Sequence, residues 1–73
     1  MNKNDIELIK CMLITKRELD NANENFEHAS GDLIDYYAYK MKADKAKLDY
    51  LIKELKQKEI SLSIIEDLEL RIV

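Results

Sequence analysis

One stretch of this chain, residues 33–58 (LIDYYAYKMKADKAKLDYLIKELKQK), has the composition and spacing of a single uninterrupted helix. It contains neither Gly nor Pro, the residues least favourable to a helix interior. Its apolar residues recur at steps of three and four, as on the faces of a helix. At about 1.5 Å per residue, such a helix would extend for about 40 Å. The rest of the chain must supply the surface that this helix packs against.

The first half of the chain carries a matching pattern. Apolar or small residues alternate at steps of four and three, the spacing of a seam that packs against another helix. This seam comprises Leu8, Met12, Thr15, Leu19, Ala22, Phe26 and Ala29. We expect a first helix over about residues 5–29, with Asn4 or Asp5 as its N-cap.

A short break separates the two expected helices. The only glycine is Gly31, which can adopt the left-handed conformation that ends a helix, and Ser30 or Asp32 can cap the next one. The second helix then covers about residues 32–58. Because so short a loop joins two helices of similar length, we expect an antiparallel hairpin.

Residues 60–73 form a third segment with two competing patterns. Ser63 and Glu66 have the spacing of a capping box, and a helical stripe follows them, whereas Ile60, Leu62 and Ile64 alternate as a strand would. We favour a short C-terminal helix because the segment lacks the Gly or Asn of tight hairpin turns, and a strand-like tail is the alternative. A second apolar group on the first helix lies away from the seam, and we expect this segment to cover it. The group comprises Ile6, Ile9 and Leu13.

The predicted fold class is therefore all-α, an antiparallel two-helix hairpin with a short C-terminal helix, in a single domain over residues 1–73. So short a chain buries only about 60% of its surface on folding and is marginally stable alone. With one cysteine and one histidine, it has neither an internal disulfide nor a His/Cys metal cluster as support. Oligomerisation can supply the missing burial, and a four-helix bundle formed by a dimer is one way to achieve it.

The second helix has two apolar faces. A broad Leu/Ile/Met side is expected to meet the first helix, and it comprises Leu33, Ile34, Tyr37, Ala38, Met41, Leu48, Leu51, Ile52 and Leu55. The opposite side also carries tyrosines and alanines, which a two-helix hairpin cannot bury. Small residues flanked by tyrosines allow another backbone to approach closely. We therefore predict that a partner binds Tyr36, Tyr39, Ala43, Ala46 and Tyr50. The expected partner is a second copy of the chain, forming a homodimer, or else a different protein.

Candidate catalytic and metal-binding residues have simpler interpretations. His28 and Glu24 lie four residues apart and could bind a metal ion with Asp32, but helical metal sites repeat such pairs and this chain has one histidine. A histidine at a helix C-terminus is favoured by the helix dipole alone. Cys11 has no identifiable base beside it and is interpreted as a packed thiol. We expect no catalytic, cofactor or metal site, and we expect that the protein is not an enzyme.

The distribution of charge leaves one alternative function open. The net charge is -3, yet residues 38–60 hold seven lysines against four acids. These lysines and the tyrosines of the second helix could contact phosphates and stack on bases, so a nucleic-acid-binding accessory protein is the alternative to an interaction module. We expect no signal peptide, no membrane association and a cytoplasmic location, because no apolar run reaches the length that spans a bilayer. No small-molecule substrate is identifiable.

Three pieces of the sequence resemble the YaaL-like family of short uncharacterised proteins from Gram-positive bacteria. They are the aromatic Phe26 before the loop, the D-L-I-D-Y start at residues 32–36, and the D-Y-L-I-K-E run at residues 49–54. The resemblance covers roughly residues 18–60. The chain departs from the family in having Ser30-Gly31 where an Asp-Pro turn is usual and Lys47-Leu48 where an Arg-Tyr pair is usual, and in its apolar tail. The family is a domain of unknown function, so the resemblance implies a fold and an occurrence in bacteria and carries no activity or catalytic residue.

Overall fold

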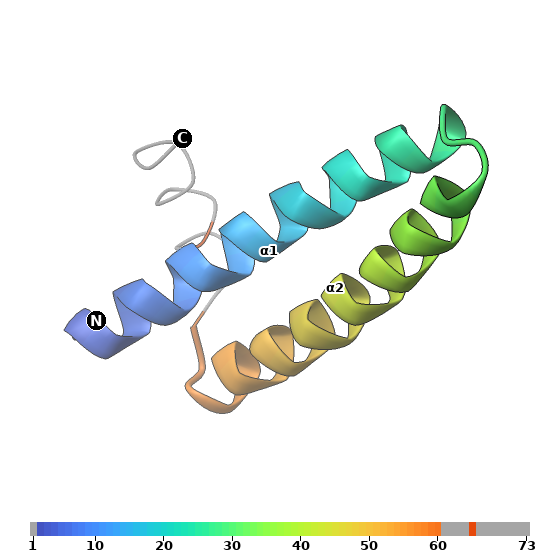
Figure 1. Ribbon diagram of the computed structural model, residues 1–73. Coiled ribbons are helices and arrows are strands. Elements are labelled where there is room, and N and C mark those ends of the chain that lie inside the picture. Colours follow the sequence, from blue (N-terminus) through green and yellow to red (C-terminus); the bar gives the residue numbers. More distant parts are fainter. Residues whose placement is uncertain (1, 61–64, 66–73) are drawn as a thin grey trace.

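The chain folds into two long antiparallel helices joined at one end by a short turn (Figure 1). The computed structural model describes residues 2–60 and residue 65. Helix α1 covers Lys3–Glu27 and helix α2 covers Asp32–Gln57. The two helices pack against each other along their length, and the described residues contain no strand. The predicted all-α hairpin is confirmed.

Helix α1 begins earlier than the sequence pattern indicated. Its N-cap is Asn2, whose side-chain Oδ1 accepts a hydrogen bond of 2.8 Å from the backbone N–H of Asp5. The prediction of Asn4 or Asp5 as the cap was therefore wrong. Asn2 has an extended backbone and an amide oxygen within reach of the N3 position, so it satisfies one of the free N–H groups of the first turn.

The turn between the helices is built around Gly31. Its φ of 60° and ψ of -137° lie in a region that side-chain-bearing residues rarely adopt, which explains the glycine. Gly31 is the N-cap residue of α2, and no side chain caps this helix, so the predicted capping by Ser30 or Asp32 was wrong. Asp32 and Asp35 instead place negative charge in the first turn, where the helix dipole favours it.

Helix α2 ends in a Schellman motif. The backbone N–H of Ile60 donates to the carbonyl of Leu55, and the N–H of Glu59 donates to the carbonyl of Lys56. The motif requires a left-handed residue directly after the C-cap residue Lys58, and this residue, Glu59, has a φ of 59°. Ile60 then turns back onto the core that contains Leu55, which is the hydrophobic contact typical of this motif.

We expect Glu59→Gly to raise the free energy of unfolding by about 0.5–1 kcal/mol, because glycine adopts the left-handed conformation without the steric cost that an L-residue bears. The Glu59 side chain is exposed, so its removal costs no packing. Chemical denaturation followed by circular dichroism measures the change. Glu59→Ala is the control, since it removes the same side chain and keeps the strain. A gain of equal size in both variants would contradict the explanation.

The hydrophobic core lies toward the open end of the hairpin, away from the turn. Its buried cluster comprises Ile9, Met12, Leu13, Leu51 and Leu55. The predicted seam of α1 faces α2, with Met12, Thr15 and Ala22 buried and the other four positions partly buried. The buried hydroxyl of Thr15 donates a hydrogen bond of 2.8 Å to the carbonyl of Cys11, which satisfies its donor within the helix.

The predicted inner side of α2 is wrong at two positions. Leu33 and Ile34 were expected to meet the first helix, yet they are 53% and 43% exposed. Both lie in the first turn of α2, next to the turn that joins the two helices. Phe26 near the end of α1 and Ala29 in the turn are themselves only half-buried, so this end of the hairpin has no buried core to receive two aliphatic side chains.

The start of the third segment covers part of the apolar group on α1. Ile60 and Ile65 pack against the buried cluster that contains Ile9 and Leu13. The same cluster includes Leu51 and Leu55 of α2, so this group is covered by α2 as well as by the residues that follow it. The predicted C-terminal helix, or strand-like tail, lies mostly outside the described residues.

Candidate interaction surface on the second helix

The five residues predicted to bind a partner all lie exposed along α2. Tyr36, Tyr39 and Tyr50 are 54%, 73% and 60% exposed, and Ala43 and Ala46 between them are also exposed. We call this row the Tyr/Ala face. Its positions alternate at steps of three and four along Asp32–Gln57, so they form one stripe on the helix. Their role in binding a partner stays a prediction.

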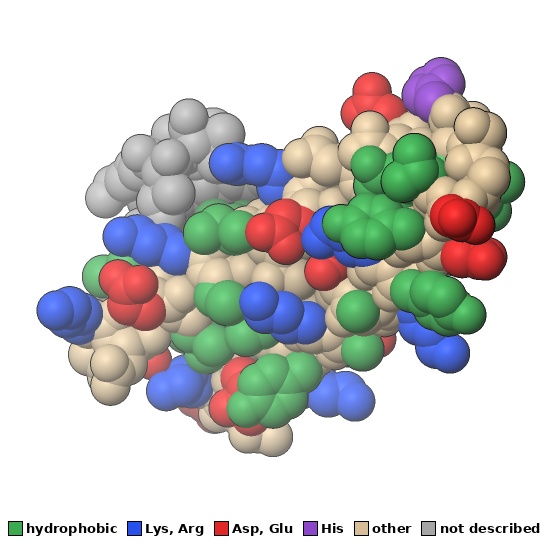
Figure 2. All heavy atoms as spheres, in the orientation of Figure 1, with side chains coloured by type: hydrophobic (Ala, Val, Ile, Leu, Met, Phe, Trp, Pro, Cys, Tyr) green, Lys and Arg blue, Asp and Glu red, His purple; other side chains and the backbone are tan. Residues whose placement is uncertain are grey.

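Helix α1 covers a different side of α2. A second stripe of the same spacing, the inner stripe, consists of buried or partly buried side chains and lies nearly opposite the Tyr/Ala face. This stripe comprises Tyr37, Met41, Asp44, Leu48, Leu51 and Leu55. Because a single helix cannot wrap around its neighbour, the hairpin leaves the tyrosines uncovered. Hydrophobic and charged side chains alternate over the visible surface of the molecule (Figure 2).

Tyr36, one of the tyrosines of the face, packs against the ring of its neighbour Tyr37. The rings of Tyr36 and Tyr37 meet edge to face, with centroids 4.8 Å apart and planes at 76°. Tyr37 is partly buried toward α1, so the contact supports Tyr36 from the side of the core. A pre-positioned aromatic ring loses less entropy on binding than a free one.

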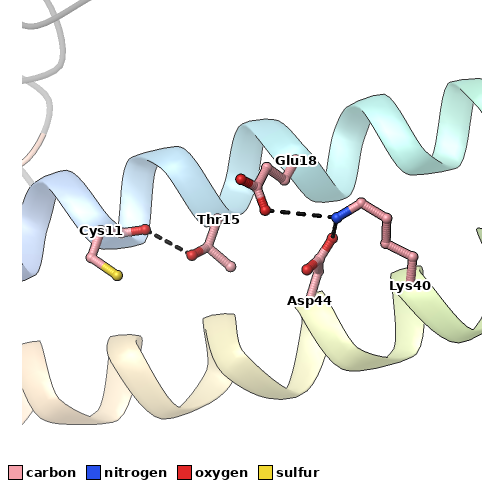
Figure 3. A network of polar contacts seen from close by, with 5 residues as sticks. All are labelled: Cys11, Thr15, Glu18, Lys40 and Asp44. Carbon is pink, nitrogen blue, oxygen red and sulfur yellow. Dashed lines mark hydrogen bonds and ion pairs between the residues drawn. The ribbon is translucent and has the colours of Figure 1, made fainter.

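A charged cluster crosses the interface between the helices. Lys40 Nζ lies 3.1 Å from Asp44 Oδ2 within α2 and 3.7 Å from Glu18 Oε2 of α1 (Figure 3). The hydrogen bond that Lys40 donates to Asp44 raises the pKa of Lys40 above its usual value, and the charge of Glu18 acts in the same direction. Asp44 is buried within the otherwise apolar inner stripe of α2, so this cluster fixes a polar layer at the middle of the hairpin.

The remaining described titratable groups form no metal-binding cluster. In residues 2–60 and 65, no three His, Cys, Asp or Glu side chains gather closely enough to hold a metal ion. His28 is the exposed C-cap residue of α1, and Cys11 is a partly buried free thiol. Over the same residues, neither helix is long and apolar enough to cross a bilayer.

Comparison with models of protein families assigns the chain to a family. The model of the family described as "Protein of unknown function (DUF2508)" matches residues 1–62. The protein belongs to the DUF2508 family. No curated protein and no solved structure matches the chain. The resemblance to a domain of unknown function is thereby confirmed, and the match includes both helices and the turn between them.

The DUF2508 hairpin also has an apolar groove that sequence reasoning missed. It lies beside the core at the open end of the hairpin and has a volume of about 510 Å³. Its lining includes Met12 and Leu19 of α1, Ile52 of α2, and Ile60 and Ile65. Periodicity identifies the side chains that face inward, but the width left between two helices depends on how their side chains meet.

Two polar features of this DUF2508 protein were also missed. The buried position of Asp44 could have been found as the one charged residue in the inner stripe of α2. The ion pair of 3.1 Å between Lys58 Nζ and Asp5 Oδ1 joins the end of one helix to the start of the other, and no local pattern reveals it. The hydrogen bond from Lys58 lowers the pKa of Asp5 below its usual value of 3.8.

We expect the Asp5–Lys58 pair to make stability depend on pH in the acid range. Because the pKa of Asp5 is lower in the folded chain than in the unfolded one, its contribution is present above the unfolded value of 3.8 and is lost as the pH falls through the lowered value. The difference in thermal midpoint between wild type and Asp5→Asn should therefore shrink in acid. Lys58→Met should behave like Asp5→Asn, and a constant difference down to about pH 2 would contradict the assignment.

Proposed function

We propose that this DUF2508 protein is a non-enzymatic interaction module that associates with a second copy of itself through the Tyr/Ala face of α2. The observation that carries the proposal is the exposure of three aligned tyrosines, each more than half exposed, on a helix whose other side is already packed against α1. The proposal also places the protein in the cytoplasm, where the free thiol of Cys11 stays reduced.

The chemistry of the face supports a protein partner. Tyrosine rings offer large contact area with few rotatable bonds, and their hydroxyls can remain hydrated at the edge of an interface. Ala43 and Ala46 lie between them and leave room for a facing backbone. The buried apolar core of the described residues comprises only six side chains, so an additional interface adds considerably to the apolar surface removed from water. That core consists of Ile9, Met12, Leu13, Ala22, Leu51 and Leu55.

The association is tested with the variant Ala43→Glu. Two carboxylates would be placed at the centre of the interface, and we expect the dissociation constant of the dimer to rise at least about a hundredfold. Sedimentation equilibrium or light scattering at several concentrations measures it. The control is Asn23→Glu, which adds the same charge at an exposed position of α1 and leaves the dimer intact. A wild type that is monomeric at every concentration, or a dimer that tolerates Ala43→Glu, would contradict the proposal.

Nucleic-acid binding, the alternative suggested by the lysines of α2, gains no support from the described ion pairs. Lys40 is paired with Asp44 and Glu18, and Lys58 is paired with Asp5, so these two ammonium groups are partly neutralised within the hairpin. Binding to DNA or RNA at low salt that weakens steeply as salt is added would favour the alternative.

A further inference from the structure

A row of charged residues follows one edge of the Tyr/Ala face. Asp35, Lys42, Asp49 and Lys56 are spaced seven residues apart, so they occupy one line along α2. We call them the edge row. Acid and base alternate along it, and three of its members immediately precede a residue of the face. All four side chains are exposed, and none forms an ion pair with another residue in the described part of the chain.

The Tyr/Ala face is also nearly symmetric about the middle of its helix. Helix α2 covers Asp32–Gln57, so its midpoint falls between residues 44 and 45. Ala43 and Ala46 are equally far from this point, and so are Tyr39 and Tyr50, whereas the counterpart of Tyr36 is Lys53. A two-fold axis through the midpoint would therefore superpose each alanine and each of these tyrosines on a residue of its own kind.

We propose that the second copy docks with its α2 antiparallel to the first, over the full length of the helix. In this arrangement Ala43 lies opposite Ala46 of the partner subunit, and Tyr39 lies opposite Tyr50 of the partner subunit. Two closely approaching backbones at the centre are flanked on both sides by pairs of tyrosine rings. The proposal rests on the proposed function and adds the orientation and register of the two helices.

The edge row supports this orientation by its charges. When two helices pair antiparallel, residues on the same edge face one another. Lys42 then faces the partner's Asp49, and Asp35 faces the partner's Lys56. The two-fold axis repeats both pairs, so each of the four positions meets an opposite charge.

A parallel pair would bring like charges together. In that orientation each residue of the edge row faces the other edge of the partner, at the position whose number is higher by five. The other edge comprises Lys40, Lys47 and Glu54. Lys42 would face the partner's Lys47, and Asp49 would face the partner's Glu54. Asp35 would face the partner's Lys40, but Asp44 and Glu18 of its own hairpin already neutralise that ammonium. The charges flanking the face therefore select the antiparallel dimer.

The second edge of the face carries one kind of unfavourable contact in the antiparallel arrangement, which the two-fold axis repeats. Lys40 would lie near the partner's Lys47. The ammonium of Lys40 is already 3.1 Å from Asp44 and 3.7 Å from Glu18, so two carboxylates of its own hairpin neutralise it. The polar layer that crosses the hairpin thus also reduces the repulsion on this side of the dimer.

The orientation is tested by reversing charges on the full chain. Lys42→Asp and Asp49→Lys each convert two attractive pairs of the antiparallel dimer into repulsive ones, and we expect the dissociation constant to rise about tenfold or more at low salt. The double variant should restore the wild-type value. An equimolar mixture of the two single variants should form heterodimers in preference to either homodimer, because one chain then carries two acids where the other carries two lysines.

The same variants distinguish the other outcomes. The control Lys45→Asp makes the same charge change at an exposed position outside the face and both of its edges, and the dimer should not respond. In a parallel dimer both single variants would replace like charges by opposite ones and tighten association, which would overturn the orientation while the proposed function stands. A dimer indifferent to all three changes would likewise overturn only the orientation. A monomeric wild type would overturn both.

Discussion

Replacing Ile9 by Ala should lower the free energy of unfolding by about 3 kcal/mol, within the range measured for truncation of buried aliphatic side chains. Ile9 is 0% exposed and lies in the buried cluster with Leu51 and Leu55 of α2. The change removes three methyl or methylene groups and leaves a cavity where the two helices meet. Because small domains have only a few kcal/mol of stability, a substantial unfolded population is expected at 37 °C.

The chain offers a matched control for this prediction. Ile14 lies in the same helix and is 52% exposed, so Ile14→Ala should change the free energy of unfolding by less than about 0.5 kcal/mol. Urea denaturation followed by circular dichroism, at a protein concentration fixed for all variants, measures both. Equal losses for the two variants would show that helix propensity, and not burial, determines the effect.

Replacing Asp44 by Leu should raise the free energy of unfolding by about 1–2 kcal/mol, because desolvation of a buried carboxylate offsets much of its attraction to a lysine. Asp44 is buried in the inner stripe one helical turn from Leu48, and a leucine there would continue the apolar contacts between the helices. Lys40 would keep Glu18 as a partner and can extend into water, since its side chain is 32% exposed.

The comparison variant Asp44→Asn separates charge from shape. It keeps the size and polarity of the side chain but removes the carboxylate that pairs with Lys40, so we expect a loss of stability where Asp44→Leu produces a gain. Thermal unfolding of both variants provides the measurement. A loss in both would show that the charged layer is itself a net source of stability in this hairpin.

Much of the fold could be predicted because helical periodicity is a local property. The seam of α1, the single turn at Gly31 and the antiparallel arrangement all follow from the spacing of apolar residues and one glycine. The exposure of Tyr36, Tyr39 and Tyr50 could also be anticipated, since a two-helix hairpin has only one inner side. The family relationship was visible in the residues around the turn and at the end of α2.

Other features depend on how the two helices meet. Leu33 and Ile34 have the right periodicity for the core but lie beside the turn, away from the buried cluster at the open end of the hairpin, and they are exposed. Glu59 adopts a left-handed backbone because the Schellman motif directs Ile60 onto the core. Its side-chain chemistry alone would not predict that conformation.

The sequence by itself determined that this DUF2508 protein forms two helices with a seam between them and a second, tyrosine-bearing face on α2, because these are consequences of side-chain spacing along a helix. Only the tertiary structure decided which charges are paired between different parts of the hairpin. Lys40 meets Glu18, and Lys58 meets Asp5, across distances that depend on the register of one helix against the other. That register results from the packing of the whole interface, so no single segment of the chain encodes it.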